Sequence, residues 1–199
     1  MQTILQRIRK LTRKRPTVRA AELAGRGIHR AQLSRLVSTG ELQRVDRGIY
    51  ALPGHLPGEH ASLVAVTQRA PGVVFCLLTA LRFHDLTTQA PSEVWIAIPN
   101  KSHPPRLTWP KLRVIRFSAD ALDAAVEDHV VDGVTLRVTS VAKTVADCFK
   151  FRSKVGLDVA LESLRDALRG RHTTTDEIWK AAQICRVTSV MRPYLESLA

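Results

Sequence analysis

The stretch from Arg19 to Leu52 constrains the fold more than any other part of the sequence, because two short helical patterns surround a glycine turn within it. We expect Thr17 to cap a first helix of small and apolar residues. Gly25 and Gly27 permit a tight turn after this helix, since glycine adopts positive φ angles without steric cost. A second helix is predicted over residues 29–39. This order is typical of a helix-turn-helix.

A hairpin is predicted directly after the second helix. Gly40 is placed to end that helix as a C-terminal glycine cap. Strand-forming residues lie on both sides of Asp46-Arg47-Gly48, a composition that favours a short two-stranded hairpin with glycine in its turn. Helix, turn, helix and hairpin together predict a winged helix-turn-helix.

A segment dense in proline and glycine, residues 53–58, is the clearest linker in the chain. We therefore predict a winged helix-turn-helix DNA-binding domain over residues 1–55 and a second domain over residues 59–199. In the second domain, helices and strands mix without a regular repeat, which favours a small sheet flanked by helices and a helical C-terminus. The predicted fold class is α+β.

The second helix of the motif has an apolar side and a polar side. Leu33, Leu36 and Val37 fall at i, i+3 and i+4, which marks the side expected to be buried. The opposite side combines small residues, which allow close approach to a DNA groove, with polar residues that bond to base edges. An ordinary solvated helix face is the alternative to this interpretation. The predicted DNA contacts on this helix are Arg30, Gln32, Ser34 and Arg35.

Positive charge is concentrated in the N-terminal part of the chain. The formal net charge is +12, and residues 1–60 hold 12 Lys and Arg against 4 Asp and Glu, whereas residues 61–199 hold 18 against 14. A cationic segment on a nearly neutral body indicates a polyanionic partner, which we predict to be double-stranded DNA. A general solubility charge and an anionic membrane surface are the alternatives. The hairpin residues Arg44 and Arg47 are predicted to touch phosphates or the minor groove. Further phosphate contacts are predicted from the end of the first basic helix, Arg13, Lys14 and Arg15.

The second domain is predicted in less detail. Ser140 is placed to cap a helix in which Lys143 and Asp147 stand one turn apart, a spacing that usually gives a weak surface ion pair. Thr174 and Glu177 have the spacing of a capping box before another helix. Strands are expected at residues 73–75, 94–98, 112–117 and 134–138, and helices at residues 59–69, at residues 77–84 and from residue 139 onward.

No set of residues in the sequence indicates catalysis. The strand after Glu93 lacks the lysine that a metal nuclease would need beside its carboxylates. No phosphate-binding loop occurs, and the adjacent His84 and Asp85 would point apart on a helix. We predict no enzymatic activity, no catalytic residue, no metal site and no cofactor.

The cysteines and the lengths of the apolar runs indicate the cellular compartment of the protein. Cys76, Cys148 and Cys185 are widely separated and odd in number, which favours buried, reduced thiols in the cytoplasm over disulfides. No apolar run approaches the roughly 20 residues needed to cross a bilayer. We therefore expect a cytoplasmic protein without a membrane partner.

Several short segments together carry a resemblance to a known family. In the N-terminal part they are LSRLVSTGEL at Leu33 to Leu42 and RGIYAL at Arg47 to Leu52. The segments further along the chain are Thr79-Ala80-Leu81 with His84-Asp85-Leu86, Val138 to Asp147, Phe151-Arg152 with Gly156-Leu157-Asp158, and Arg192 to Leu195. Together these segments resemble the AbiEi-type antitoxins of type IV toxin–antitoxin systems. Thr79 and Asp85 depart from the pattern of that family.

The resemblance implies two roles for the chain. The winged helix would bind the operator of its own operon and repress it. Residues 59–199, as an antitoxin-like domain, would counter a nucleotidyltransferase toxin without requiring a stable complex, in a system linked to phage defence. Fold carries function only by analogy. Two alternatives stay open: a nuclease that the winged helix targets to DNA, and an adaptor whose C-terminal domain binds a toxin protein directly.

Overall fold

The contacts of the chain divide it into two units, which we describe separately. A computed structural model describes residues 3–12, 17–46, 48–53, 60–107 and 109–198. One unit comprises Met1–Val64 with Val130–Val134, and the other comprises Ala65–His129 with Thr135–Ala199. Of the predicted linker, residues 54–58 lie outside the described residues. The assignment of a DNA-binding domain to residues 1–55 and an antitoxin-like domain to residues 59–199 stays a prediction.

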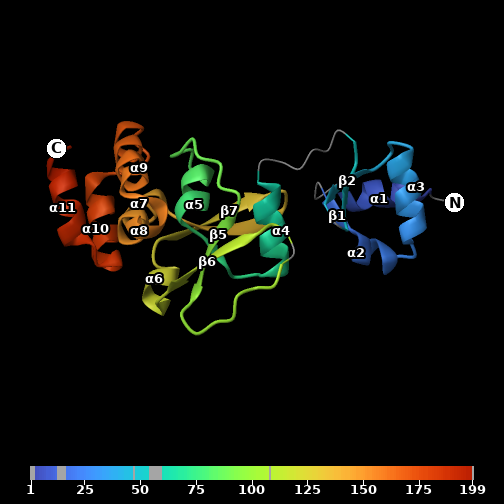
Figure 1. Cartoon of the computed structure of the whole chain (residues 1–199), viewed down its shortest axis with the longest axis horizontal. Helices are drawn as coiled ribbons and strands as arrows, with labels where there is room; N and C mark the ends of the chain where they lie inside the picture. Colours follow the sequence, from blue (N-terminus) through green and yellow to red (C-terminus); the bar gives the residue numbers. More distant parts are fainter. Residues whose placement is uncertain (1–2, 13–16, 47, 54–59, 108, 199) are drawn as a thin grey trace. The chain divides into compact units, whose positions relative to one another are not determined.

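The first unit contains three short helices and a three-stranded antiparallel sheet (Figure 1). In the sheet, β3 lies between β1 and β2. The predicted hairpin corresponds to β2 and β3, which pair antiparallel. The elements in chain order are α1 (Ile4–Thr12), β1 (Thr17–Arg19), α2 (Ala20–Ala24), α3 (Arg30–Ser38), β2 (Gln43–Asp46) and β3 (Ile49–Ala51).

The prediction that Thr17 caps the first helix of the motif was wrong. Thr17 begins β1, where it pairs with Ala51, and α2 starts only at Ala20. The pairing explains the difference, because Val18 lies opposite Tyr50 and both side chains are buried in the core of this unit. Three residues are too few to show a strand pattern in the sequence, so the partner strand decides their conformation.

One apolar cluster holds the first unit together. Each helix contributes a buried side chain, and the sheet covers them from one side. Since a single buried Leu or Ile stabilises a fold by about 1.5–3 kcal/mol, these few contacts set the orientation of α3. The cluster consists of Ile8, Val18, Leu23, Ile28, Leu33, Leu42, Tyr50 and Leu52.

The second unit is built on a five-stranded sheet with the strand order β6-β5-β4-β8-β7 (Figure 1). β4 is antiparallel to β5 and parallel to β8, while β5 and β6 are parallel. The strands are β4 (Val74–Phe75), β5 (Val94–Pro99), β6 (Leu112–Phe117), β7 (Val126–Val131) and β8 (Val134–Thr139). The helices are α4 (Ala61–Arg69), α5 (Leu77–Phe83), α6 (Ala119–Asp123), α7 (Val141–Lys150), α8 (Arg152–Val155), α9 (Leu157–Arg169), α10 (Thr175–Cys185) and α11 (Thr188–Glu196). The first four residues of α4 and the turn between β7 and β8 with its adjoining residues are counted with the first unit.

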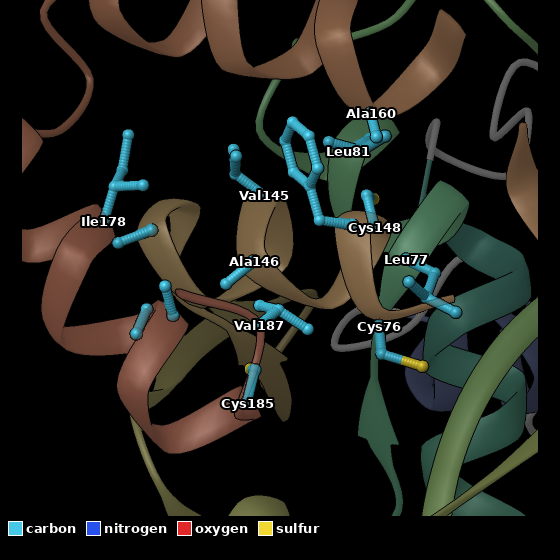
Figure 2. Close-up of a cluster of buried hydrophobic side chains, with 14 of the residues drawn as sticks. Cys76, Leu77, Leu81, Val145, Ala146, Cys148, Ala160, Ile178, Cys185 and Val187 are labelled. Atoms are coloured by element: carbon cyan, nitrogen blue, oxygen red, sulfur yellow. The ribbon is translucent and has the colours of Figure 1, made fainter. Parts of the chain in front are cut away.

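Helix α7 is the centre of the second unit. It packs against α5, α9 and α10, and eight of its ten residues are buried. Its apolar side chains Val145, Ala146 and Cys148 lie within the main hydrophobic cluster (Figure 2). The expected small sheet and helical C-terminus are therefore present, and β7 and α6 are additional elements that the sequence pattern did not predict. No helix in the described part of the chain has the length and apolarity to span a bilayer.

Candidate functional site

Helix α3 carries the four predicted contacts of the recognition helix. Leu33 is buried on its inner side, while Arg30, Ser34 and Arg35 are exposed and Gln32 is partly buried. Arg30 and Ser34 are one turn apart and so lie on the same side of the helix, whereas Arg35 points about 100° away from Ser34 around the axis. All three side chains are exposed. Their role in binding stays a prediction.

Gln32 has a structural task within the same helix. Its side-chain Oε1 accepts a hydrogen bond from the backbone N–H of His29 at 2.9 Å, just before the helix begins. This contact satisfies one of the backbone N–H groups at the start of the helix. The side-chain oxygen is engaged, so the side-chain NH₂ of Gln32 is the group that would bond to a base.

The turn between α2 and α3 is closed by its own backbone. The N–H of Gly27 donates to the carbonyl of Ala24 at 2.9 Å, and the N–H of Ile28 donates to the carbonyl of Leu23 at the same distance. Gly27 has a φ of +74°, which confirms the need for glycine at this position. Since Leu23 and Ile28 are also buried, the turn holds α3 at a set angle to α2.

The end of α3 and the hairpin also follow the predicted pattern. Gly40 has a φ of +73°, and the N–H of Leu42 donates to the carbonyl of Leu36 at 2.9 Å, so glycine ends the helix as expected. Arg44 is exposed on β2, where its backbone lies opposite Tyr50. The other predicted contacts, Arg13, Lys14, Arg15 and Arg47, lie outside the described residues.

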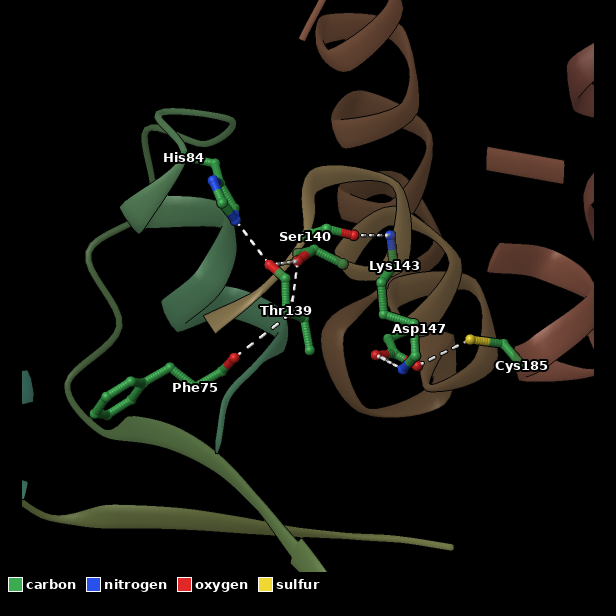
Figure 3. Close-up of polar contacts among 8 residues, drawn as sticks. Phe75, His84, Thr139, Ser140, Lys143, Asp147 and Cys185 are labelled. Atoms are coloured by element: carbon green, nitrogen blue, oxygen red, sulfur yellow. Dashed lines mark hydrogen bonds and ion pairs between the residues drawn. The ribbon is translucent and has the colours of Figure 1, made fainter. Parts of the chain in front are cut away.

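A buried polar network surrounds α7 in the second unit (Figure 3). Lys143 and Asp147 form an ion pair at 2.5 Å, with side-chain exposures of 0% and 2%. The Lys143 ammonium lies 4.6 Å from the centre of the Phe117 ring. Asp147 also accepts a hydrogen bond from the Cys185 thiol at 3.1 Å, which links α7 to α10.

The prediction of a surface ion pair between Lys143 and Asp147 was therefore wrong. The i, i+4 spacing brings the two side chains together on a helix, but it carries no information about what covers them. Helices on several sides of α7 remove both groups from water. Burial raises the pKa of Asp147, and the Lys143 ammonium opposes that effect. Such a pair contributes little net stability, whereas an unpaired charge at the same place is strongly destabilising.

A second part of the network fixes the junction of β8 and α7 (Figure 3). Thr139 and Thr144 place their hydroxyl oxygens 2.7 Å apart, and Thr144 Oγ1 donates to the carbonyl of Thr139 at 3.0 Å. His84 Nε2 lies 2.8 Å from the same carbonyl. Ser140 caps α7 as predicted, since its side chain accepts from the N–H of Lys143.

The cysteines are buried and none of them forms a disulfide. Burial raises the pKa of Cys76 and Cys148 well above the usual range, and it raises the pKa of Cys185 to about 12. Thiols with such pKa values are unreactive at neutral pH. Among the described residues, no group of three or more His, Cys, Asp or Glu side chains is arranged to hold a metal ion.

The N-terminal part of the chain matches the model of a known protein family. Residues 6–53 match the family model described as "Transcriptional regulator, AbiEi antitoxin". The resemblance to AbiEi-type antitoxins is thereby confirmed for these residues, which contain α3 and the hairpin. The match does not include the C-terminal segments, whose resemblance to the family stays a prediction. A search of curated proteins found no match.

The whole fold has a counterpart among solved structures. The crystal structure of the RV2827C protein from Mycobacterium tuberculosis is similar over 98% of this chain and 82% of that one, with a TM-score of 0.54. The two sequences are 17% identical. At this identity the likeness extends to the fold alone.

Replacing Lys143 should destabilise the second unit strongly. In the Lys143→Met variant the Asp147 carboxyl would stay buried without its partner, so the free energy of unfolding should fall by about 3–5 kcal/mol. Urea unfolding followed by circular dichroism measures the effect. The exposed Lys154 provides a control, because Lys154→Met should change stability by less than about 0.5 kcal/mol. Equal stability of the two variants would contradict the structural role of the pair.

His84 should make folding sensitive to mild acid. Burial is the main cause that lowers the pKa of His84, so the folded chain favours the neutral ring, whose Nε2–H donates to Thr139. The folded state then binds fewer protons than the unfolded state, and stability is lost as the pH falls below the usual histidine pKa of about 6.5. The drop in melting temperature between pH 7.5 and 5.5 should be smaller in His84→Gln than in wild type. The exposed His103 provides the control as His103→Gln, and an unchanged drop in His84→Gln would refute the assignment.

Proposed function

We propose that residues 1–55 form a winged helix-turn-helix with which the chain binds the operator of its own operon and represses transcription. The observation that carries this proposal is the match of residues 6–53 to the AbiEi transcriptional regulators. The element order α1-β1-α2-α3-β2-β3 supports it, because a helix-turn-helix followed by a hairpin is the layout of winged-helix domains. The exposed polar side of α3 supports it further.

In this proposal α3 enters the major groove with its exposed side. Ala31 and Ser34 are small enough to let the helix approach the bases closely. Arg30 and Arg35 reach base edges or phosphates, and an arginine can form two hydrogen bonds to one guanine. Gln32 would contribute through its side-chain NH₂, since its side-chain oxygen accepts a hydrogen bond from the backbone N–H of His29.

The remaining cationic side chains would contact the DNA backbone. Arg44 and Arg47 would act from the hairpin, where a wing touches phosphates or the minor groove. Arg13, Lys14 and Arg15 would add phosphate contacts from the segment after α1. Such contacts position the protein on the duplex and carry no sequence information of their own.

We further propose that the chain is the antitoxin of a type IV toxin–antitoxin system. Residues 59–199 would oppose a nucleotidyltransferase toxin encoded next to the chain, and no stable complex between the two proteins is required. The chain would have no enzymatic activity and would act in the cytoplasm. The proposed antitoxin role is supported by the word "antitoxin" in the description of the family that residues 6–53 match.

Removal of the Arg35 side chain should weaken operator binding specifically. If Arg35 bonds to a guanine, Arg35→Ala should lose about 1–3 kcal/mol of binding free energy on the operator and much less on random duplex. Fluorescence anisotropy with both duplexes measures this difference. Arg165→Ala is the matched control, because it removes an exposed arginine from the second unit. An equal loss on both duplexes would make Arg35 a phosphate contact, and no loss would remove it from the interface.

The antitoxin activity should be separable from repression. When the adjacent nucleotidyltransferase gene is expressed from an inducible promoter, co-expression of the chain should restore growth, and Arg35→Ala should restore it equally well. Rescue without co-purification would agree with type IV antagonism. A stable complex of the two proteins would favour the adaptor instead, and metal-dependent cleavage of DNA or RNA by the purified chain would favour a nuclease.

A further inference from the structure

The surplus of positive charge in residues 61–199 comes from one segment. Residues 61–199 hold 18 Lys and Arg against 14 Asp and Glu, a surplus of 4. Residues 94–119 alone contain five Lys and Arg and no Asp or Glu. Outside this segment the C-terminal part therefore has 13 cationic and 14 anionic side chains, so it is close to neutral.

The basic segment forms one edge of the five-stranded sheet. It comprises β5, the long loop of residues 100–111 and the edge strand β6 (Figure 1). All five cationic side chains are exposed. They are Lys101, Arg106, Lys111, Arg113 and Arg116, and we call this set the basic edge.

The start of the loop is held in place by Arg116. Its Nη1 donates to the carbonyls of Asn100 at 2.7 Å, Ser102 at 2.8 Å and Pro99 at 3.4 Å. Three backbone contacts from one guanidinium tie the loop to β6. Arg113 is also oriented, since its guanidinium lies 5.4 Å from the centre of the Trp95 ring and 3.8 Å from the Glu93 carboxylate, which compensates part of its charge. The basic edge is thus partly preorganised, which reduces the entropy lost on binding.

Ring side chains lie between the cationic residues of the loop. His103 is exposed between Lys101 and Arg106, and Trp109 is partly exposed between Arg106 and Lys111. A track of cationic side chains interleaved with rings is the arrangement that binds single-stranded nucleic acid, because phosphates pair with the cations and unstacked bases stack on the rings.

The secondary structure of the basic edge favours a single strand over a duplex. Its described residues form strands and a loop, with no helix longer than one turn to enter a major groove. A membrane surface fits poorly, because the large apolar side chains exposed in the described chain all lie elsewhere, at Val130, Leu157, Ile184 and Leu198.

We infer that the basic edge is a second nucleic-acid-binding surface, which takes single-stranded RNA or DNA and is separate from the duplex-binding face of α3. RNA and DNA share the phosphates and bases that this surface recognises. The inference does not depend on the proposed operator binding, because the two surfaces use different residues and different forms of nucleic acid.

The test uses the full chain and fluorescently labelled oligo(U) and oligo(dT) of about twelve nucleotides, a length suited to one binding site. Anisotropy measured over a series of salt concentrations gives the affinity and the salt slope. Lys101→Ala/Arg106→Ala/Lys111→Ala should bind at least tenfold more weakly than wild type. Its salt slope should be less steep by about 2, since each single-strand phosphate contact contributes about 0.7.

A matched variant removes the same number of charges elsewhere. Lys154→Ala/Arg165→Ala/Arg169→Ala loses three exposed cations from the C-terminal helices and should bind both oligonucleotides as wild type does. Trp109→Ala should weaken binding about five- to hundredfold, and Trp109→Phe should restore most of it, because the loss is one of base stacking. Unchanged melting temperatures of the charge variants exclude unfolding as the cause.

The affinities for oligo(U), oligo(dT) and a DNA duplex distinguish RNA binding, single-stranded DNA binding and duplex binding. Tighter binding of oligo(U) than of oligo(dT) would identify RNA as the preferred ligand, and the reverse would identify DNA. Equal affinities of the two triple variants for both single strands would overturn the inference. Loss of duplex binding alone in the Lys101 triple variant would also overturn it, because the basic edge would then serve duplex binding. Arg35→Ala should bind the single strands as wild type does.

Discussion

The second unit depends on the neutralisation of one buried cation. Lys143 points into the centre of the unit, where its ammonium has no access to water. Asp147 compensates its charge and also accepts a hydrogen bond from the Cys185 thiol (Figure 3). The ring of Phe117 lies against the ammonium. Isolated charges in such a place would cost several kcal/mol. The arrangement of α7, α10 and β6 therefore has to hold four side chains in register.

Hydrogen bonds from buried polar side chains also join the strands and helices around α7. Thr139 and Thr144 bond across the junction of β8 and α7, and His84 reaches the carbonyl of Thr139 from the end of α5. At the other end of α5's buried side, Thr79 accepts a hydrogen bond from the N–H of Trp95 on β5.

Much of the first unit could be predicted from its sequence, because local rules determine it. Leu33, Leu36 and Val37 mark the inner side of α3 at helical spacing, and Gly27 and Gly40 occupy positions with positive φ. The polar face of α3 follows as the complement of its apolar side. Strand β1 could not be predicted, since Val18 owes its extended conformation to pairing with Tyr50 on β3.

The sequence by itself determined the helices α2 and α3 around a glycine turn, the hairpin of β2 and β3, the caps at Ser140 and Thr174, and the segments that carry positive charge. These features depend on neighbours within one or two turns of the chain. Only the tertiary structure decided that Lys143 and Asp147 are buried and that β4 lies between β5 and β8. Periodicity indicates which residues share a side of an element. Whether water or another element lies against that side depends on residues distant in the sequence.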